Sequence, residues 1–384
     1  MGRFSRSVMV VGVVVFLMGG VGWGYEPKTL EVGTSAPDFE LPAVDGRNYR
    51  LADFADAKVL VVIFTCNHCP TAQAYEERIK KLTADYKDKG VTVVCISSND
   101  PCALRLDEMA WSDVGDSFED MKIRAKDKGF NFPYLYDGDS QEVAKLYGPV
   151  TTPHTFIFDK ERKLRYVGRI DSSEWKEKPD AVQDTRNAID ALLAGKEVEV
   201  AKTKTFGCSI KWSDKRAMVK KELEELAKEE VTVETIDAAG VKELVKNDTK
   251  KLRLINVWAT WCGPCKYEFP ELVKTYRIYR NRRTTEFELV TISTDPPKVK
   301  DAVLSFLKEY QASCKNYHFD SDNIYELIEA VDKDWEGGIP YTLLVAPGGK
   351  IIYRVMGMGL YVPLEVKKAI VGYYADILPW WASE

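Results

Sequence analysis

The sequence has only a small excess of acidic over basic residues and few cysteines for its length. Its 384 residues include 54 Lys and Arg against 59 Asp and Glu, for a formal net charge of -5. A mildly acidic chain lacks the basic footprint of a nucleic-acid-binding protein, so we expect no nucleic-acid partner. The 8 cysteines are too sparse for a scaffold held together by disulfides. The length instead suggests about two domains, each with its own core.

Long hydrophobic runs are absent except at the N-terminus. Two arginines there precede an apolar stretch over residues 8–21, and two glycines follow it. This order is typical of a secretory signal peptide over residues 1–24. Retention as a membrane anchor is the alternative, because the run approaches the length of a spanning helix. We expect an exported, periplasmic or otherwise extracytoplasmic protein, membrane-anchored if the segment is not cleaved, in a compartment where disulfides can form.

The rest of the chain contains one internal repeat built around two Cys-x-x-Cys motifs. Each motif follows an apolar run rich in β-branched residues and precedes a helical pattern, and each half later has a proline before another apolar strand. The order β-α-β-α-β-β-α occurs twice. It predicts an α/β fold with two mixed central sheets flanked by helices, parallel except at a late antiparallel strand pair. The prolines are Pro153 and Pro340.

A charge-dense helical pattern over residues 213–230 separates the two halves. We therefore expect a first domain over residues 30–212 and a second domain over residues 231–384. The segment between them, residues 213–230, is expected to form a helical linker.

This pattern of strand, Cys-x-x-Cys, helix and late X-Pro resembles the thioredoxin fold. The second half resembles exported thioredoxin-like reductases of the TlpA/ResA type, on NVWATWCGPCKYEFPEL (256–272) and GGIPYTLLVAPGGKIIYRVMG (337–357). The first half resembles thioredoxin-like members of the AhpC/TSA (redoxin) superfamily. The matching segments are VGTSAPDFELPAVDGRNYRLADF (32–54), FTCNHCP (64–70), TPHTFIFD (152–159) and GRIDSS (168–173). The resemblance implies two tandem thioredoxin-like folds.

The two motifs predict redox-active dithiols. A thiol attacks a disulfide as its thiolate, and a helix N-terminus favours that anion through unpaired N–H groups and the helix dipole. We expect Cys66 and Cys262 to be the attacking thiolates, and Cys69 and Cys265 to resolve the mixed disulfides. Zinc is one alternative, but the two pairs lie too far apart for one four-cysteine module, so we expect neither metal nor cofactor. A purely structural disulfide would close too short a loop to stabilise the chain much.

The residue inside the first motif distinguishes it from the second. A cationic His68 beside the helix N-terminus would favour the Cys66 thiolate, whereas the alternative is a solvated histidine of the first turn. His68 is also a candidate for contact with substrate. Because a stabilised thiolate makes its disulfide more oxidising, we expect Cys66–Cys69 to be the more oxidising pair.

Two further residues of the second motif are candidates for function. Glu268 follows Cys265 by three residues and shares its helix face. The resemblance to ResA-like proteins implies that Glu268 accepts the proton of Cys265, and a surface glutamate is the alternative. Trp261, adjacent to Cys262, is expected to line the surface that contacts substrate.

The two prolines are candidates for substrate binding. The resemblance implies that Pro153 and Pro340 follow cis peptide bonds beside the dithiols. The backbone of Thr152 and of Ile339 could then pair with an extended substrate segment. A trans proline at a strand entrance is the alternative in each half.

The other four cysteines give weaker signals. Cys95 lies within an apolar strand and is expected to be a small buried hydrophobic residue. Cys102, Cys208 and Cys314 fall in loop-like sequence, and a disulfide between Cys95 and Cys102 is one alternative. Cys208, in FGCSIKW, is the last part of the redoxin resemblance, and the sequence assigns it no role.

Together these features predict an exported protein-disulfide oxidoreductase with two Cys-x-x-Cys sites. Its expected partners are disulfide-containing or dithiol client proteins, with a membrane electron donor as a further candidate. Two alternatives stay open for the first domain: a thiol peroxidase, or a module that binds clients without catalysis. The peroxidase pattern Pro-x-x-x-Thr-x-x-Cys is poorly matched, because Val62 and Cys66 stand where its Pro and Thr would precede Cys69.

Overall fold

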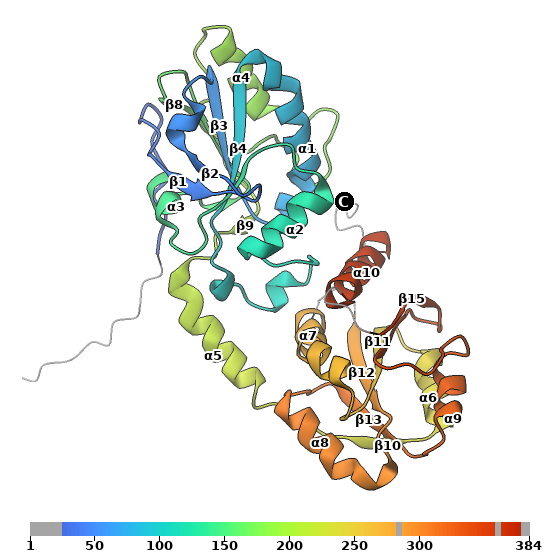
Figure 1. The fold of residues 1–384 in the computed structure, drawn as a ribbon. Coiled ribbons are helices and arrows are strands. Elements are labelled where there is room, and N and C mark those ends of the chain that lie inside the picture. Colours follow the sequence, from blue (N-terminus) through green and yellow to red (C-terminus); the bar gives the residue numbers. More distant parts are fainter. Residues whose placement is uncertain (1–24, 282–285, 358–361, 378–384) are drawn as a thin grey trace, which may run out of the picture.

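The computed structural model describes residues 25–281, 286–357 and 362–377 (Figure 1). The expected signal segment, residues 1–24, lies outside the described residues. Two α/β units follow one another along the chain, and each has a central mixed sheet flanked by helices. This architecture confirms the fold class predicted from the repeat. No helix within the described residues is both long and apolar enough to cross a membrane.

The first unit is built on a five-stranded sheet in the order β5-β4-β3-β7-β8. β3 runs parallel to β4, which runs parallel to β5, while β7 and β8 are antiparallel to their neighbours. The strands are β3 (Val59–Thr65), β4 (Val91–Ser97), β5 (Tyr134–Tyr136), β7 (His154–Phe158) and β8 (Leu164–Gly168). Its helices are α1 (Pro70–Tyr86), α2 (Phe118–Lys128), α3 (Glu142–Tyr147) and α4 (Asp184–Leu193). Every residue of β3 is buried, as expected for a central strand covered on both faces.

The second unit repeats this plan on a six-stranded sheet in the order β10-β13-β12-β11-β14-β15. The strands are β10 (Glu234–Ile236), β11 (Leu252–Trp258), β12 (Phe287–Ser293), β13 (Lys315–Phe319), β14 (Tyr341–Val345) and β15 (Ile351–Met356). Its helices are α6 (Ala238–Lys246), α7 (Gly263–Tyr279), α8 (Lys300–Glu309), α9 (Ile324–Val331) and α10 (Val362–Ile377). The antiparallel pair β14–β15 lies at one edge of the sheet, as the sequence pattern predicts.

Each unit also contains a strand and helix that the sequence pattern did not show. These are β5 with α3 in the first unit and β13 with α9 in the second. β5 has only three residues, and β13 carries polar side chains on Lys315, Asn316 and His318. Neither strand is therefore visible as an apolar run.

Several shorter elements lie outside the two large sheets. A hairpin pairs β1 (Glu40–Pro42) with β2 (Asn48–Arg50). A two-residue strand, β6 (Thr151–Thr152), pairs antiparallel with β9 (Cys208–Ser209), which comes after α4. The helix α5 (Arg216–Leu226) lies between the two sheets (Figure 1).

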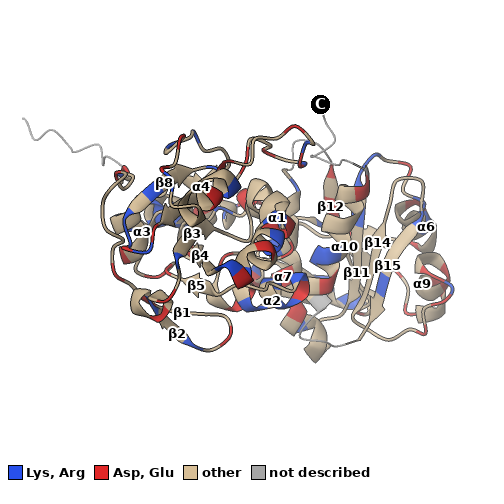
Figure 2. Ribbon diagram, turned by 90° about the horizontal axis from the view of Figure 1, so that it is seen from above, with Lys and Arg blue, Asp and Glu red and all other residues tan. Residues whose placement is uncertain are grey.

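A loop of the first unit packs against the second unit. Ala110 belongs to a buried apolar cluster of the second unit, and Leu106 and Met109 pack against that cluster. The hydroxyl of Tyr279 donates a hydrogen bond to the carbonyl of Ser112, 2.9 Å away. Seen from above, α7 and α10 lie beside the first unit, and acidic and basic residues are interspersed over both units (Figure 2). We name residues 104–116 the bridging loop.

Candidate redox sites

The first dithiol lies between the end of β3 and the start of α1. Cys69 is the N-cap of α1, and its sulfur accepts a hydrogen bond from the Ala72 N–H at 3.5 Å. Cys66 lies one turn earlier, outside the helix. Placing Cys66 at the helix N-terminus was therefore wrong. Pro70 explains the difference, because proline lacks an N–H and suits the first helical position directly after the cap.

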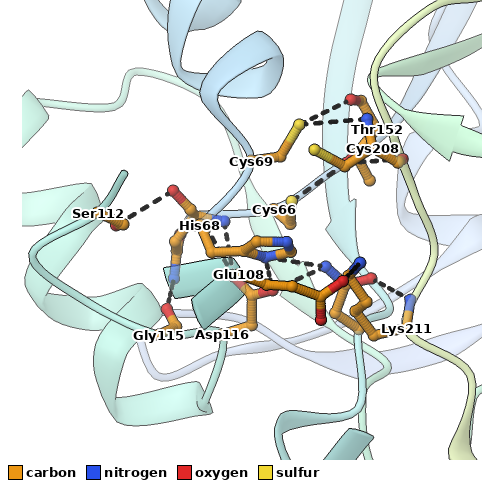
Figure 3. A network of polar contacts seen from close by, with 12 residues as sticks. Cys66, His68, Cys69, Glu108, Ser112, Gly115, Asp116, Thr152, Cys208 and Lys211 are labelled. Carbon is orange, nitrogen blue, oxygen red and sulfur yellow. Dashed lines mark hydrogen bonds and ion pairs between the residues drawn. The ribbon is translucent and has the colours of Figure 1, made fainter. Parts of the chain in front are cut away.

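Both sulfurs of the first site lie against Thr152 (Figure 3). The Cys66 sulfur is 3.1 Å from the Thr152 hydroxyl, and the Cys69 sulfur is 3.3 Å from the Thr152 carbonyl oxygen. The backbone N–H of Cys208 donates to the Cys69 sulfur at 3.4 Å. Cys66 and Cys69 are free thiols and both are buried.

These contacts distribute negative charge unequally between the two thiols. Burial opposes ionisation of Cys69, but hydrogen bonds from Cys208 and Cys66 and the charge of His68 outweigh it. The pKa of the Cys69 thiol therefore falls well below its usual value. Burial, together with the hydrogen bond to Cys69, raises the pKa of Cys66 well above the usual value. The structure thus favours a thiolate on Cys69, not on Cys66 as the sequence suggested.

A buried ion pair supplies the positive charge. His68 Nδ1 lies 2.5 Å from Asp116 Oδ2, and both side chains are buried. Burial alone would lower the pKa of His68, but the charge of Asp116 and its hydrogen bond raise it. Asp116 also accepts hydrogen bonds from the backbone N–H of Asn67 and the side chain of Asn99. His68 is only 1% exposed, so its side chain is buried and not solvated as the alternative supposed.

The backbone edge expected to receive a substrate in the first site is already occupied. The peptide bond before Pro153 is cis, as the resemblance implies. Thr152, however, pairs with Cys208 across β6 and β9. The expected free edge at Thr152 is therefore filled by the chain's own later segment, which no local sequence signal reveals.

The same region could in principle offer metal ligands. Cys66, His68 and Asp116 are buried, and their ligand atoms lie within 4.8 Å of one another. Structural zinc sites take four ligands, however, and here His68 and Asp116 already form an ion pair. The arrangement fits an ion pair beside a thiol better than a metal centre.

The second dithiol is oxidised and its surroundings are exposed. Cys262 and Cys265 form a disulfide with a Cα–Cα distance of 5.3 Å. Cys262 is the N-cap of α7, as the sequence predicts, and its sulfur accepts from the Cys265 N–H at 3.2 Å. Trp261 is 68% exposed and Tyr267 is 64% exposed. Two large exposed aromatic side chains thus lie close in sequence to a disulfide whose own cysteines are buried.

The second cis proline also lies beside its dithiol. The peptide bond before Pro340 is cis, and the carbonyl of Ile339 lies 3.8 Å from the Cys262 sulfur. Ile339 belongs to no strand. Its position therefore differs from that of Thr152, which β9 pairs with.

Glu268 is buried in α7, three residues after Cys265. It is 5% exposed, so it is not a surface glutamate. Burial raises its pKa to about 7, against a hydrogen bond from Asn256 that lowers it. The Asn256 side chain lies 3.0 Å from both Glu268 Oε1 and the hydroxyl of Thr342. A carboxyl with this pKa can accept or release a proton near neutral pH.

The remaining cysteines fall into different environments. Cys95 is fully buried in β4, as predicted, and burial raises its pKa well above the usual value. Cys314 is also buried, whereas Cys102 is exposed. Cys95 and Cys102 are both free, so the alternative disulfide between them is not formed. Sequence reasoning missed the position of Cys208 beside Cys69 and the pairing of Asp116 with His68, since both depend on contacts between distant segments.

Comparison with known proteins agrees with this architecture. Residues 31–185 match the family model described as Redoxin, and residues 250–351 match one described as Thioredoxin-like. The chain is 31% identical over 103 residues to the thiol-disulfide oxidoreductase ResA of Bacillus subtilis (strain 168), a match that covers 27% of this chain and 51% of that protein. It is 28% identical over 181 residues to ResA of Bacillus thuringiensis subsp. konkukian (strain 97-27), covering 45% of this chain and 92% of that protein.

One solved structure of higher identity has no assigned activity. It is the crystal structure of a hypothetical protein from Sinorhizobium meliloti 1021, with 38% identity and a TM-score of 0.43. The match covers 49% of this chain and 98% of that one.

The repeated fold, the paired cysteines and these relatives define the class of the protein as a thioredoxin-fold thiol–disulfide oxidoreductase. The chain belongs to the redoxin-type thioredoxin-fold proteins, in a tandem form. Its first domain is a redoxin domain, and its second is a thioredoxin-like domain related to ResA.

Proposed function

We propose that the protein is exported and uses both Cys-x-x-Cys pairs to reduce or exchange disulfides in secreted or membrane-facing client proteins. One observation carries this proposal. Both pairs lie at the junction of a central strand with the following helix and beside a cis proline. Repetition of the whole arrangement argues for shared chemistry in the two domains.

In the second site, the reduced Cys262 thiolate attacks a client disulfide. The client S–S bond breaks, a mixed disulfide with Cys262 forms, and one client thiol leaves. Cys265 then attacks the Cys262 sulfur, which releases the second client thiol and restores the Cys262–Cys265 disulfide. Glu268 accepts the proton that Cys265 loses, consistent with its pKa of about 7. The exposed Trp261 offers an aromatic contact for the client.

In the first site, Cys66 and Cys69 exchange electrons by the same chemistry. The environment of Cys69 stabilises its thiolate, and a stabilised thiolate stabilises the reduced form. The first pair is therefore the more oxidising of the two.

Reduction of insulin disulfides by dithiothreitol tests the activity. We expect Cys262→Ser to lower the rate by at least about tenfold, because it removes the attacking thiolate. Cys66→Ser should lower any remaining activity of a Cys262→Ser/Cys265→Ser chain. Cys102→Ser, which changes an exposed cysteine outside both sites, is the matched control. Equal rates for Cys262→Ser and Cys102→Ser would contradict the proposal for the second site.

Export is tested separately by the N-terminus of the protein recovered from cells. We expect the mature chain to begin near residue 25 and to accumulate outside the cytoplasm. Recovery of the full-length chain in the cytoplasm would contradict the export proposal while leaving the redox chemistry intact.

A further inference from the structure

A third cysteine lies beside the first dithiol. Cys208 is in β9, directly opposite Thr152 in β6. Its backbone N–H donates a hydrogen bond to the Cys69 sulfur at 3.4 Å. It also packs against the small buried cluster of Cys66, Cys69 and Ala72. The side chains of the three cysteines point toward one another from the segment that precedes α1 and from β9 (Figure 3).

The segment that carries Cys208 is held in place on both sides. Gly207 has a φ of +124°, and a Cβ atom there would lie 2.2 Å from the Thr152 carbonyl oxygen. Only glycine lets the chain pass this close to Thr152. On the other side, the Lys211 N–H donates to Asn99 at 2.9 Å, and the Lys211 ammonium lies 2.6 Å from Glu108. The fold therefore positions Cys208 at the dithiol with contacts of its own.

We propose that Cys208 is a third redox cysteine of the first site, which exchanges with the Cys66–Cys69 disulfide to form a Cys69–Cys208 disulfide. This inference rests on the proposed redox role of Cys66 and Cys69. The Cys208 sulfur attacks the Cys69 sulfur, the Cys66–Cys69 bond breaks and the Cys69–Cys208 bond forms. The proton of Cys208 passes to the departing Cys66 thiolate. The step needs no added oxidant or reductant, because one disulfide replaces another.

The charge distribution allows this exchange in the oxidised state only. In the reduced site, the hydrogen bond to Cys69 is the largest cause that raises the pKa of Cys208, so Cys208 stays protonated. Once Cys69 is part of a disulfide, that anion is gone and Cys208 loses its proton more readily. After the exchange, Cys66 is a free thiol again, and the disulfide now joins Cys69 to Cys208 of β9.

Peptide mapping of the full chain distinguishes the two disulfides. Trypsin leaves Cys66 and Cys69 on one peptide, residues 59–78, and Cys208 on another, residues 205–211. The protein carries Cys262→Ser and Cys265→Ser to silence the second site. It is equilibrated with oxidised and reduced glutathione, blocked with an alkylating agent, digested without reduction and analysed by mass spectrometry.

We expect the two peptides to be cross-linked, and the cross-link to be the main oxidised product when Cys66→Ser is added. Cys208→Ser should abolish it and leave the disulfide within residues 59–78. A disulfide within residues 59–78 without any cross-link would overturn the role of Cys208 but leave the redox role of the first dithiol intact. The absence of both disulfides would overturn both proposals.

A second variant tests the position of β9 without touching a sulfur. Gly207→Ala places a Cβ against the Thr152 carbonyl and should lower the cross-link yield by about tenfold. Gly195→Ala is the matched control, because Gly195 also has a positive φ, of +66°, but nothing lies within 4 Å of its Cβ position. Equal cross-link yields in the two variants would contradict the proposed geometry.

Discussion

The position of one proline decides which cysteine caps the helix in each motif. Pro70 follows Cys69 and takes the first helical position, so Cys69 is the N-cap of α1. In the second motif, Pro264 stands one residue later within the first turn, and Cys262 is the N-cap of α7. The N–H groups of the first turn therefore stabilise the second cysteine of one motif and the first cysteine of the other.

The buried pair of His68 and Asp116 gives a test of this electrostatic account. In Asp116→Asn, His68 loses the charge that raises its pKa and becomes neutral near pH 7. The Cys69 thiolate then loses a nearby cation, so the reduced form is less stable. We expect the potential of the first dithiol to become more negative by about 30 mV, equivalent to about 1.4 kcal/mol.

Equilibration with glutathione in a Cys262→Ser/Cys265→Ser chain measures this potential. Asp88→Asn, at an exposed position, is the control for the loss of one carboxylate. A potential for Asp116→Asn that equals or exceeds that of the control chain would show that His68 does not stabilise the thiolate.

The raised pKa of Glu268 should make the free energy of unfolding depend on pH. Its folded pKa is about 7 and its ordinary value is 4.5, so the folded state binds the proton more tightly. This stabilisation is complete below pH 4.5 and is lost as the pH rises through about 7. Glu268→Gln stays neutral, so it should match the parent protein at pH 4 and exceed its stability by up to about 3 kcal/mol at pH 8.

Urea unfolding at the two pH values measures this difference. Glu309→Gln changes an exposed glutamate of α8 and should show no such dependence. A stability gain for Glu268→Gln that is the same at pH 4 and pH 8 would mean that folding does not shift the pKa of Glu268.

At the scale of elements, the sequence predicted what local patterns encode. β3 and β11 lie before the two Cys-x-x-Cys motifs, and β7 and β14 directly follow Pro153 and Pro340, where the apolar runs predict strands. The two-residue strands β6 and β9 could not be predicted, because they exist only through pairing between distant segments.

The same limit applies to the candidate sites. The cysteine pairs and Glu268 stand out in the sequence, whereas the roles of Asp116 and Cys208 depend on the folded chain.

The N-cap of α7 gives a prediction at this scale. In a chain that also carries Cys265→Ser, Cys262→Ser keeps a side chain that can accept from the N–H of residue 265, whereas Cys262→Ala does not. We expect the alanine variant to be less stable by about 1 kcal/mol in urea unfolding. The matched comparison is between Cys265→Ser and Cys265→Ala, each in a chain that carries Cys262→Ser. Residue 265 lies inside the helix and is not its N-cap, so this pair measures the effect of the same substitution without the cap. A similar Ser-to-Ala difference at both positions would contradict the capping role of residue 262.

In the whole molecule, the bridging loop connects the first redox site to the second domain. Its Asp116 pairs with His68, and its Ser112 hydroxyl donates to the Asn67 carbonyl. The carbonyl of the same Ser112 accepts from Tyr279 in α7. An ion pair between Asp127 of α2 and Lys368 of α10 joins the domains at a second place. The loop that supports the first dithiol is therefore also part of the interface.

This shared loop predicts that the two domains unfold together. Ala110 is buried in the apolar cluster of the second domain, so Ala110→Arg forces a large charged side chain into that contact. We expect calorimetry of the parent protein to show one thermal transition, and Ala110→Arg to show two. Ala52→Arg introduces the same side chain at an exposed position of the first domain and should keep the single transition. A single unchanged transition in Ala110→Arg would show that the bridging loop does not couple the domains. If the buried contact of Ala110 held the two domains together, the arginine would disrupt it and the domains would no longer unfold as one cooperative unit.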